Sequence, residues 1–179
     1  MVTIIADEGK FAIGMELYQE FLSKNVEAEY ITLENVQIKP CVNCGGCSYK
    51  TYGKCVIRDD GDWIYPKIIR TDVLIFVTPI TFGSYSLKVK RTFDKFGVFM
   101  DRHYYLVNGE LAKGGSVGKQ FRYFAVGVQE QSDLAGVAAF KTLFRENLII
   151  TRGAGDVYIT GTSLSDDSKS EIVRGVTNI

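Results

Sequence analysis

Val73-Leu74-Ile75-Phe76-Val77 is a continuous apolar run near the middle of a chain of 179 residues. A strand with one face in water alternates apolar and polar side chains, whereas a strand buried on both faces of a parallel sheet is apolar throughout. We therefore predict that residues 73–77 form the central strand of a parallel sheet. Parallel strands need crossover connections, so helices must cover both faces of that sheet.

Outward from this run, strand-like and helix-like patterns alternate along the chain. The apolar spacing predicts further strands at residues 2–6, 28–33, 121–128 and 156–160. It predicts helices at residues 11–22, 63–69, 87–96 and 134–150. Alternation of this kind is typical of a doubly wound α/β sheet. Because no repeat, linker or low-complexity tract divides the chain, we expect residues 1–179 to form a single domain.

Net charge and the length of the apolar runs exclude two classes of partner. Twenty-one basic residues balance 21 acidic ones, which leaves no electrostatic footprint for a nucleic-acid backbone. No apolar run approaches the roughly 20 residues of a membrane-spanning helix, and the sequence after Met1 has no signal-peptide pattern. We therefore expect a cytoplasmic protein with neither a nucleic-acid nor a membrane partner.

The four cysteines of the chain form one cluster with the spacing C-x2-C-x2-C-x7-C, at Cys41, Cys44, Cys47 and Cys55. A domain of this size does not need disulfides to fold, and in a reducing compartment such a cluster indicates a metal, cluster or redox site. Four thiolates suit both an iron–sulfur cluster and structural zinc. The compact C-x2-C-x2-C spacing favours iron, because zinc ribbons separate two C-x2-C pairs by a longer spacer. Zinc and unligated thiols remain alternatives.

A resemblance to a known family is carried by residues 38–96. They contain P-C-x-x-C-x-x-C at 40–47, G-x-C-x-x-x-D-D at 53–60, a loop with proline and phenylalanine at 79–86, and a helical segment with Lys90, Phe93 and Asp94. This string resembles the NADPH-dependent FMN reductase branch of the flavodoxin-like superfamily. Within that branch it is most similar to the iron–sulfur flavoproteins.

The resemblance implies a fold and a set of cofactor sites. The fold is a flavodoxin-like sheet of five parallel strands in the order 2-1-3-4-5, with FMN at its carboxyl edge. The implied flavin-binding residues are Pro79, Ile80, Thr81, Phe82, Gly83 and Ser84. A [4Fe-4S] cluster would lie close to the flavin, on Cys41, Cys44, Cys47 and Cys55. The family also implies NAD(P)H as a donor and a homo-oligomer, either a dimer or a tetramer.

The predicted function is that of a redox protein, an NAD(P)H-dependent FMN reductase-like oxidoreductase that passes electrons between FMN and a [4Fe-4S] cluster. Its partners would be a small-molecule or protein electron donor and acceptor. The cofactors carry such chemistry, and we predict no catalytic side chain, because His103 is the sole histidine and no acid–base constellation accompanies it.

Two departures from the family pattern leave alternatives open. Asp7-Glu8-Gly9-Lys10 stands where family members place a phosphate loop rich in Ser, Thr and Gly, and carboxylates beside a phosphate are unfavourable. Thr81 stands where an aromatic residue is common, next to Phe82. The scaffold could therefore have lost FMN and act as a cluster- or zinc-bearing relay or binding module, or it could be a plain flavin reductase with unligated cysteines. In the residues alone, 78–84 also fits an ordinary strand-to-helix turn with Ser84 as the N-cap.

Overall fold

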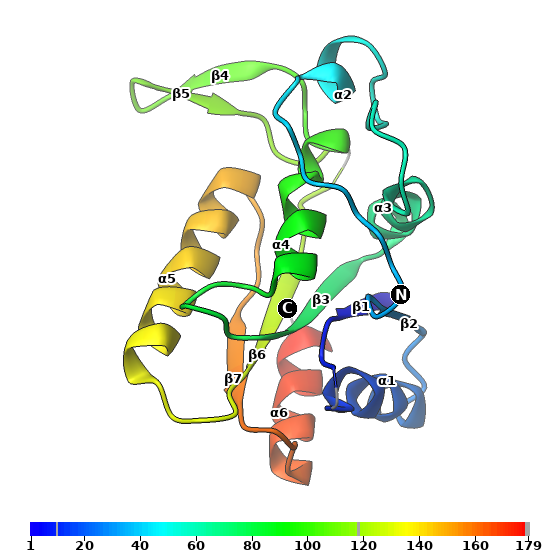
Figure 1. Cartoon of the computed structure of the whole chain (residues 1–179), viewed down its shortest axis with the longest axis vertical. Coiled ribbons are helices and arrows are strands. Elements are labelled where there is room, and N and C mark those ends of the chain that lie inside the picture. Colours follow the sequence, from blue (N-terminus) through cyan, green and yellow to red (C-terminus); the bar gives the residue numbers. More distant parts are fainter. Residues whose placement is uncertain (10, 118, 178–179) are drawn as a thin grey trace.

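The computed structural model describes residues 1–9, 11–117 and 119–177. Its centre is a parallel sheet of five strands in the order β2-β1-β3-β6-β7 (Figure 1). The strands are β1 (Val2–Ala6), β2 (Ala28–Thr32), β3 (Val73–Pro79), β6 (Tyr123–Val128) and β7 (Val157–Thr160). When only the five strands of this sheet are numbered in chain order, leaving out β4 and β5, the order is 2-1-3-4-5. The predicted flavodoxin-like fold is therefore confirmed. The predicted central strand is β3, whose residues 73–78 are all buried.

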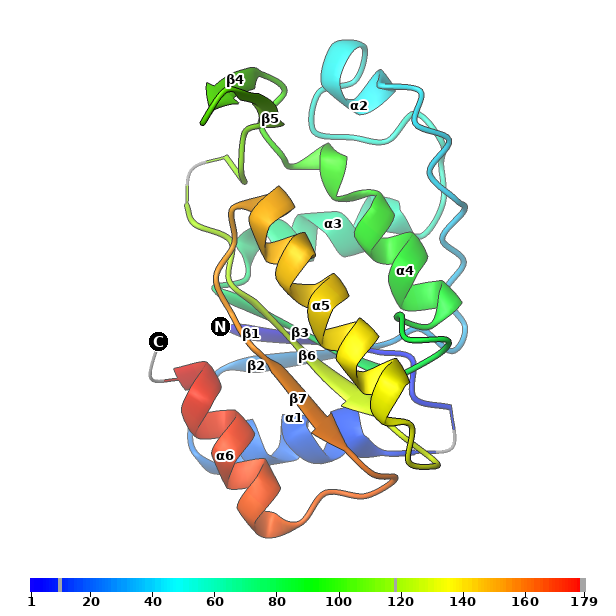
Figure 2. The same ribbon diagram turned by 90° about the vertical axis from the view of Figure 1, so that its left-hand side faces the viewer.

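Helices cover both faces of this sheet, as Figure 2 shows. On one face lie α1 (Ile13–Ser23) and α6 (Asp166–Thr177), and on the other α3 (Gly61–Arg70), α4 (Leu87–Asp94) and α5 (Leu134–Thr151). Outside these layers are the short helix α2 (Gly46–Tyr49), the 3-10 turn η1 (Phe96–Val98) and a hairpin of β4 (Tyr104–Val107) and β5 (Glu110–Lys113). In the described ranges, no helix combines the length and apolar character that crossing a bilayer demands.

Aromatic side chains fill the core between the sheet and the face of α3, α4 and α5. Phe76 of β3 lies with its ring centroid 6.0 to 6.4 Å from those of Tyr85, Phe93 and Phe96. Burial raises the pKa of Tyr85 to about 12, and its hydroxyl accepts a 3.2 Å hydrogen bond from Asn147 on α5. Buried hydroxyl groups need such a partner, so this bond fixes α5 against the start of α4.

The structure adds elements that the sequence patterns did not reveal. Helix α6 was not predicted because only Ile172, Val173 and Val176 of its 12 residues are buried, which is a weak apolar signal. The hairpin β4–β5 lies in residues 97–120, where no period was found. Helix α3 begins at Gly61, two residues before the predicted start.

A buried ion pair joins the long β2–α3 connection to the end of α4. The Lys95 ammonium donates to the Asp59 carboxylate, and their side chains are 1% and 3% exposed. Asp59 also accepts the N–H groups of Lys39 at 2.8 Å and of Gly61 at 2.9 Å. Burial raises the pKa of Asp59, but Lys95 and the two N–H groups outweigh it and hold the pKa below its usual range. The three hydrogen bonds to this carboxylate therefore tie Lys39, the start of α3 and the end of α4 together.

Replacing Asp59 with Asn should lower the free energy of unfolding by about 3–5 kcal/mol, because it leaves the Lys95 charge buried without its partner. Urea denaturation at pH 7 measures the loss. The matched control is Asp62→Asn, which removes a partly exposed pair with Arg58 (2.9 Å) and should cost at most about 1 kcal/mol. Equal losses of unfolding free energy in the two variants would contradict the conclusion that the buried pair of Asp59 and Lys95 stabilises the fold.

The same pair predicts a pH dependence of stability. A carboxylate whose folded pKa is depressed stabilises the fold above its unfolded pKa of about 3.9, and this contribution is lost as the pH falls through the lower folded pKa. The difference between wild type and Asp59→Asn should therefore be constant near neutral pH and shrink below about pH 4. Urea midpoints at pH 7, 5 and 3 test this.

Candidate functional site

Two hollows lie at the carboxyl edge of the sheet, where ligands of doubly wound folds bind. The first, which we call the edge hollow, measures about 440 Å³. It lies between residues 79–81 after β3 and residues 128–133 after β6. The second, the acidic hollow, measures about 380 Å³ and lies around the start of α1. Both volumes are in the range of small-molecule sites.

A tight turn borders the edge hollow between β3 and α4. Thr81 and Ser84 exchange two backbone hydrogen bonds of 2.9 and 3.0 Å, and φ is 51° at Phe82 and 70° at Gly83. Two consecutive positive φ angles characterise a type I′ turn. A Cβ on Gly83 would lie 2.7 Å from that of Ala139 on α5, so the turn also needs glycine for its close approach. The Phe82 side chain, in a backbone region that bulky residues rarely adopt, is fully exposed.

The structure distributes the predicted flavin-binding residues unevenly. Pro79, Ile80 and Thr81 line the edge hollow. Phe82, Gly83 and Ser84 form the turn beside it and do not line it. The alternative N-cap at Ser84 is wrong: the cap is Ser86, whose hydroxyl accepts the N–H of Val89 at 3.3 Å. The reason is that Ser84 closes the turn with its backbone, so the helix begins two residues later.

The acidic hollow contains a carboxylate that the helix α1 already binds. Glu8 is 8% exposed, and it accepts hydrogen bonds from the Gly14 N–H and from the Tyr30 hydroxyl, the latter at 2.8 Å. Burial raises the pKa of Glu8, and the hydrogen bonds from Gly14, Tyr30 and the Met15 backbone offset this only in part. Lys10, the base of the predicted loop, lies outside the described residues. The N-terminus of α1 thus holds a carboxyl group supplied by the chain itself.

Other charges around the acidic hollow are also unfavourable to a phosphate. Asp7 and Glu34 line it together with Glu8, and Lys88 is the one cation of the described lining. The Lys88 ammonium donates to the carbonyls of Leu33 and Glu34 at 2.8 and 2.9 Å and lies 4.0 Å from Asp7. The described residues at this end therefore do not fit the phosphate of FMN.

All four cysteines line one cavity of about 150 Å³, which we call the cysteine cavity. Cys41 and Cys44 are exposed, and Cys47 and Cys55 are half-buried. Gly46 allows the loop to fold on itself, because a Cβ there would lie 2.6 Å from the Val56 side chain. Among the described residues, no three His, Cys, Asp or Glu side chains converge closely enough to chelate a single ion. The thiols surround a space without meeting at a point.

The cysteine cavity and the edge hollow lie at opposite ends of α4. The cavity is lined by Asp94 and Lys95, where the helix ends, whereas the 79–86 loop enters the helix at Leu87. Eight residues of α-helix span about 12 Å. The β2–α3 connection runs back along α4 before it reaches α2 (Figure 1). The two hollows are thus separated by about the length of α4, and a cluster close to the flavin stays a prediction.

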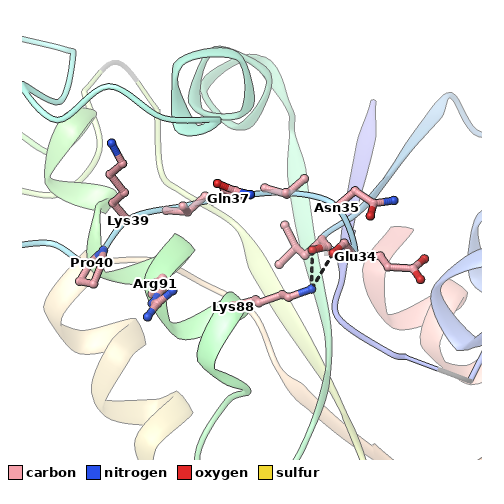
Figure 3. Close-up of a pocket in the computed structure, with 10 residues that line it drawn as sticks. Glu34, Asn35, Gln37, Lys39, Pro40, Lys88 and Arg91 are labelled. Carbon is pink, nitrogen blue, oxygen red and sulfur yellow. Dashed lines mark hydrogen bonds between the residues drawn. The ribbon is translucent and has the colours of Figure 1, made fainter.

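A third hollow, which the sequence analysis missed, lies between these two ends. The basic hollow measures about 500 Å³ and lies between residues 33–40 and the side chains of Lys88 and Arg91 on α4 (Figure 3). Lys39 also lines it, and the Nε atom of Arg91 is buried with no hydrogen-bond partner among the described residues. The detectable signal was the i, i+3 spacing of Lys88 and Arg91, which places both on one helix face.

The curated relatives of the chain are iron–sulfur flavoproteins. One from Methanosarcina thermophila is 31% identical over 95 residues, which are 53% of this chain and 48% of that protein. One from Methanocaldococcus jannaschii is 34% identical over 80 residues, 45% of this chain and 40% of that protein. The chain thus spans about half the length of the curated relatives that it matches.

Solved structures share the fold at low sequence identity. The NAD(P)H:quinone oxidoreductase from Methanothermobacter marburgensis has a TM-score of 0.63 and 17% identity, over 99% of this chain and 98% of that one. An FMN-dependent NADH-azoreductase from Bacillus anthracis, in complex with FMN, has a TM-score of 0.60 and 12% identity, over 99% and 97%. Residues 12–158 match the family described as NADPH-dependent FMN reductase. This match covers most of the chain and includes the edge hollow and the cysteine cavity, and the chain belongs to the NADPH-dependent FMN reductase family.

Proposed function

We propose that the chain is a flavin-dependent oxidoreductase that passes electrons between FMN and a [4Fe-4S] cluster. The observation that carries the proposal is that Cys41, Cys44, Cys47 and Cys55, the complete cysteine content of the chain, line one cavity. Bound there, a cluster supplies one-electron chemistry, and a bound flavin exchanges one or two electrons. The protein's own part is to hold both groups and to set their environment. The names of the curated relatives support the same pair of groups.

The arrangement of the thiols favours a cluster over zinc. A tetrahedral zinc ion binds each sulfur at about 2.3 Å, so its four sulfurs must nearly touch one another. The described cysteines do not converge in that way. In a [4Fe-4S] cluster each thiolate binds a separate iron, so the four sulfur atoms need to surround a compact space but do not need to meet at one point. Cys41 and Cys44 come from an exposed loop, Cys47 from α2, and Cys55 from beyond a further turn.

Protein purified without oxygen should contain about four iron and four sulfide ions per chain. Cys47→Ser should lower the iron content and bleach the charge-transfer absorption, because it removes a thiolate from the centre of the motif. Val42→Ala, an exposed apolar residue of the same loop, is the control and should keep both. Stoichiometric zinc without iron would refute the cluster and leave the relay alternative.

We place the flavin ring at the edge hollow. Pro79, Ile80 and Thr81 lie on one side of it and residues 128–133 on the other. The exposed Phe82 stands at the adjoining turn, where its ring is available to stack on a flat ligand. Phe82 is fully exposed at a φ of 51°, so packing against the described residues does not explain a phenylalanine there, which supports a role in binding.

Phe82→Gly should weaken flavin binding about twofold to tenfold, the range for loss of an aromatic stacking contact. It should not lower the free energy of unfolding, since glycine accepts a φ of 51° more readily than phenylalanine. Fluorescence quenching of the flavin and urea denaturation measure the two effects. Ile149→Ala, an exposed apolar residue in the last turn of α5, is the control. Unchanged affinity in Phe82→Gly would remove Phe82 from the site.

We assign the basic hollow to the phosphates of an NAD(P)H donor. Lys39 and Arg91 line it as cations, and Glu34 is the single acid of the described lining. Lys88 also lines it, with its ammonium donating to the carbonyls of Leu33 and Glu34. Arg91 lines the hollow from one face of α4, and arginine–phosphate hydrogen bonds are among the strong ones. Arg91→Gln should raise KM for NADPH about tenfold and leave kcat unchanged, because it removes binding and not chemistry.

The control for Arg91 is Lys90→Gln on the same helix. Lys90 forms an ion pair with Asp94 and does not line the basic hollow. Steady-state kinetics with NADPH as the varied substrate should show no change in this variant. If both variants raise KM equally, the effect is one of overall charge. If neither does, the donor binds elsewhere or is a protein.

A second candidate function is a relay without flavin, and the buried Glu8 favours it. In that case the purified protein would show cluster absorption, and added FMN or riboflavin would leave its spectrum and fluorescence unchanged. The predicted dimer or tetramer stays a prediction under either function.

A further inference from the structure

The carboxylate of Glu8 lies in a position built for an anion. It lies at the N-terminus of α1, directly after β1, and accepts hydrogen bonds from the Gly14 N–H and the Tyr30 hydroxyl. Free N–H groups and the helix dipole make such a terminus attractive to negative charge. Strands β1 and β3 flank the point where the strand order reverses, which is where FMN binds in sheets of this order.

The surroundings hold Glu8 in this position by close packing. Gly14 has no room for a side chain: a Cβ would lie 2.9 Å from that of Ala6, 3.0 Å from a Tyr30 ring carbon and 3.2 Å from a Glu8 oxygen. Glycine at this position lets the carboxylate reach the helix N–H. Tyr30, on the neighbouring strand β2, closes the other side. Burial raises the pKa of the Tyr30 hydroxyl first, and the Glu8 carboxylate raises it further, so the hydroxyl stays a donor.

We propose that Glu8 is a specificity-determining residue that occupies the phosphate position with the chain's own carboxylate, so that flavin is bound through its ring and not through its phosphate. This rests on the proposed flavin-dependent function and deepens it. Riboflavin, which has the same ring and no phosphate, should then bind at least as tightly as FMN. The flavin would then be an exchangeable ligand, because the protein would not bind its phosphate.

Most of the charged side chains that the structure describes around Glu8 also disfavour a phosphate. Asp7 and Glu34 line the same hollow, and the nearby Glu16 on α1 adds repulsion. Lys88 is directed to backbone carbonyls. A dianionic phosphate would therefore meet carboxylates at a helix terminus where the Gly14 N–H already donates to Glu8.

The test compares FMN with riboflavin on the wild-type protein and three variants. Glu8→Ser empties the position and supplies a small hydroxyl. Glu8→Gln removes only the charge and keeps an oxygen for the Gly14 N–H, which guards against loss of the fold. Asp7→Asn is the charge-matched control, since Asp7 lines the same hollow but does not cap α1. Flavin fluorescence quenching gives each Kd, and thermal unfolding checks each fold.

Wild type should bind riboflavin at least as tightly as FMN. Glu8→Ser should bind FMN tenfold or more tightly than wild type, Glu8→Gln by a smaller factor, and both should bind riboflavin within twofold of wild type. Asp7→Asn should change either Kd less than threefold. Wild type that prefers FMN over riboflavin tenfold would overturn the inference and leave the proposed function standing. An equal gain in Asp7→Asn and Glu8→Ser would also overturn it, and failure of all four proteins to bind either flavin would overturn both.

Discussion

The buried ion pair of Asp59 and Lys95 is the contact on which the cysteine cavity depends. Residues 33–60 form a long connection with one short helix in it, so backbone hydrogen bonds alone do not fix its course. Asp59 gathers the N–H groups of Lys39 and Gly61 and the Lys95 ammonium onto one carboxylate. Lys95 is itself part of the cavity wall. The pair thus sets where the cysteines lie relative to α4. Separating Asp59 from Lys95 would leave a buried charge without its partner, which is strongly unfavourable, so the connection is held in this position.

The elements that the sequence predicted are those whose periodicity is strong. A strand buried on both faces, such as β3, has an unmistakable apolar run, and the order of the sheet followed from the family resemblance. Helix α6 was not predicted because it buries only three side chains. The hairpin β4–β5 was not predicted because its strands have four residues each and Tyr104, Leu106 and Leu111 are exposed. The place of the cysteine cavity could not be predicted, since the course of an irregular connection depends on contacts such as Asp59–Lys95, 36 residues apart.

Glu8 shows the same limit at the level of a single site. The sequence reveals an acid in the position of a phosphate loop, and elementary electrostatics already argues against a phosphate there. The sequence does not reveal that the Glu8 carboxyl group accepts hydrogen bonds within the fold. Tyr30, 22 residues away, and the Gly14 N–H turn an unfavourable charge into a helix cap. A local motif shows which residue type is present. Tertiary contacts decide whether that residue only repels the phosphate of a ligand or occupies the phosphate position itself.

A zero net charge conceals a separation of charge along one edge of the molecule. The acidic hollow has Asp7, Glu8 and Glu34, and the basic hollow has Lys39 and Arg91. Lys88 and Glu34 line both, so the two hollows adjoin, and the sign of the lining changes from one to the other. Adjacent hollows of opposite charge orient a ligand that is anionic at one end. Such a ligand is favoured with its phosphate toward α4 and disfavoured with its phosphate toward α1, which the charge count alone could not show.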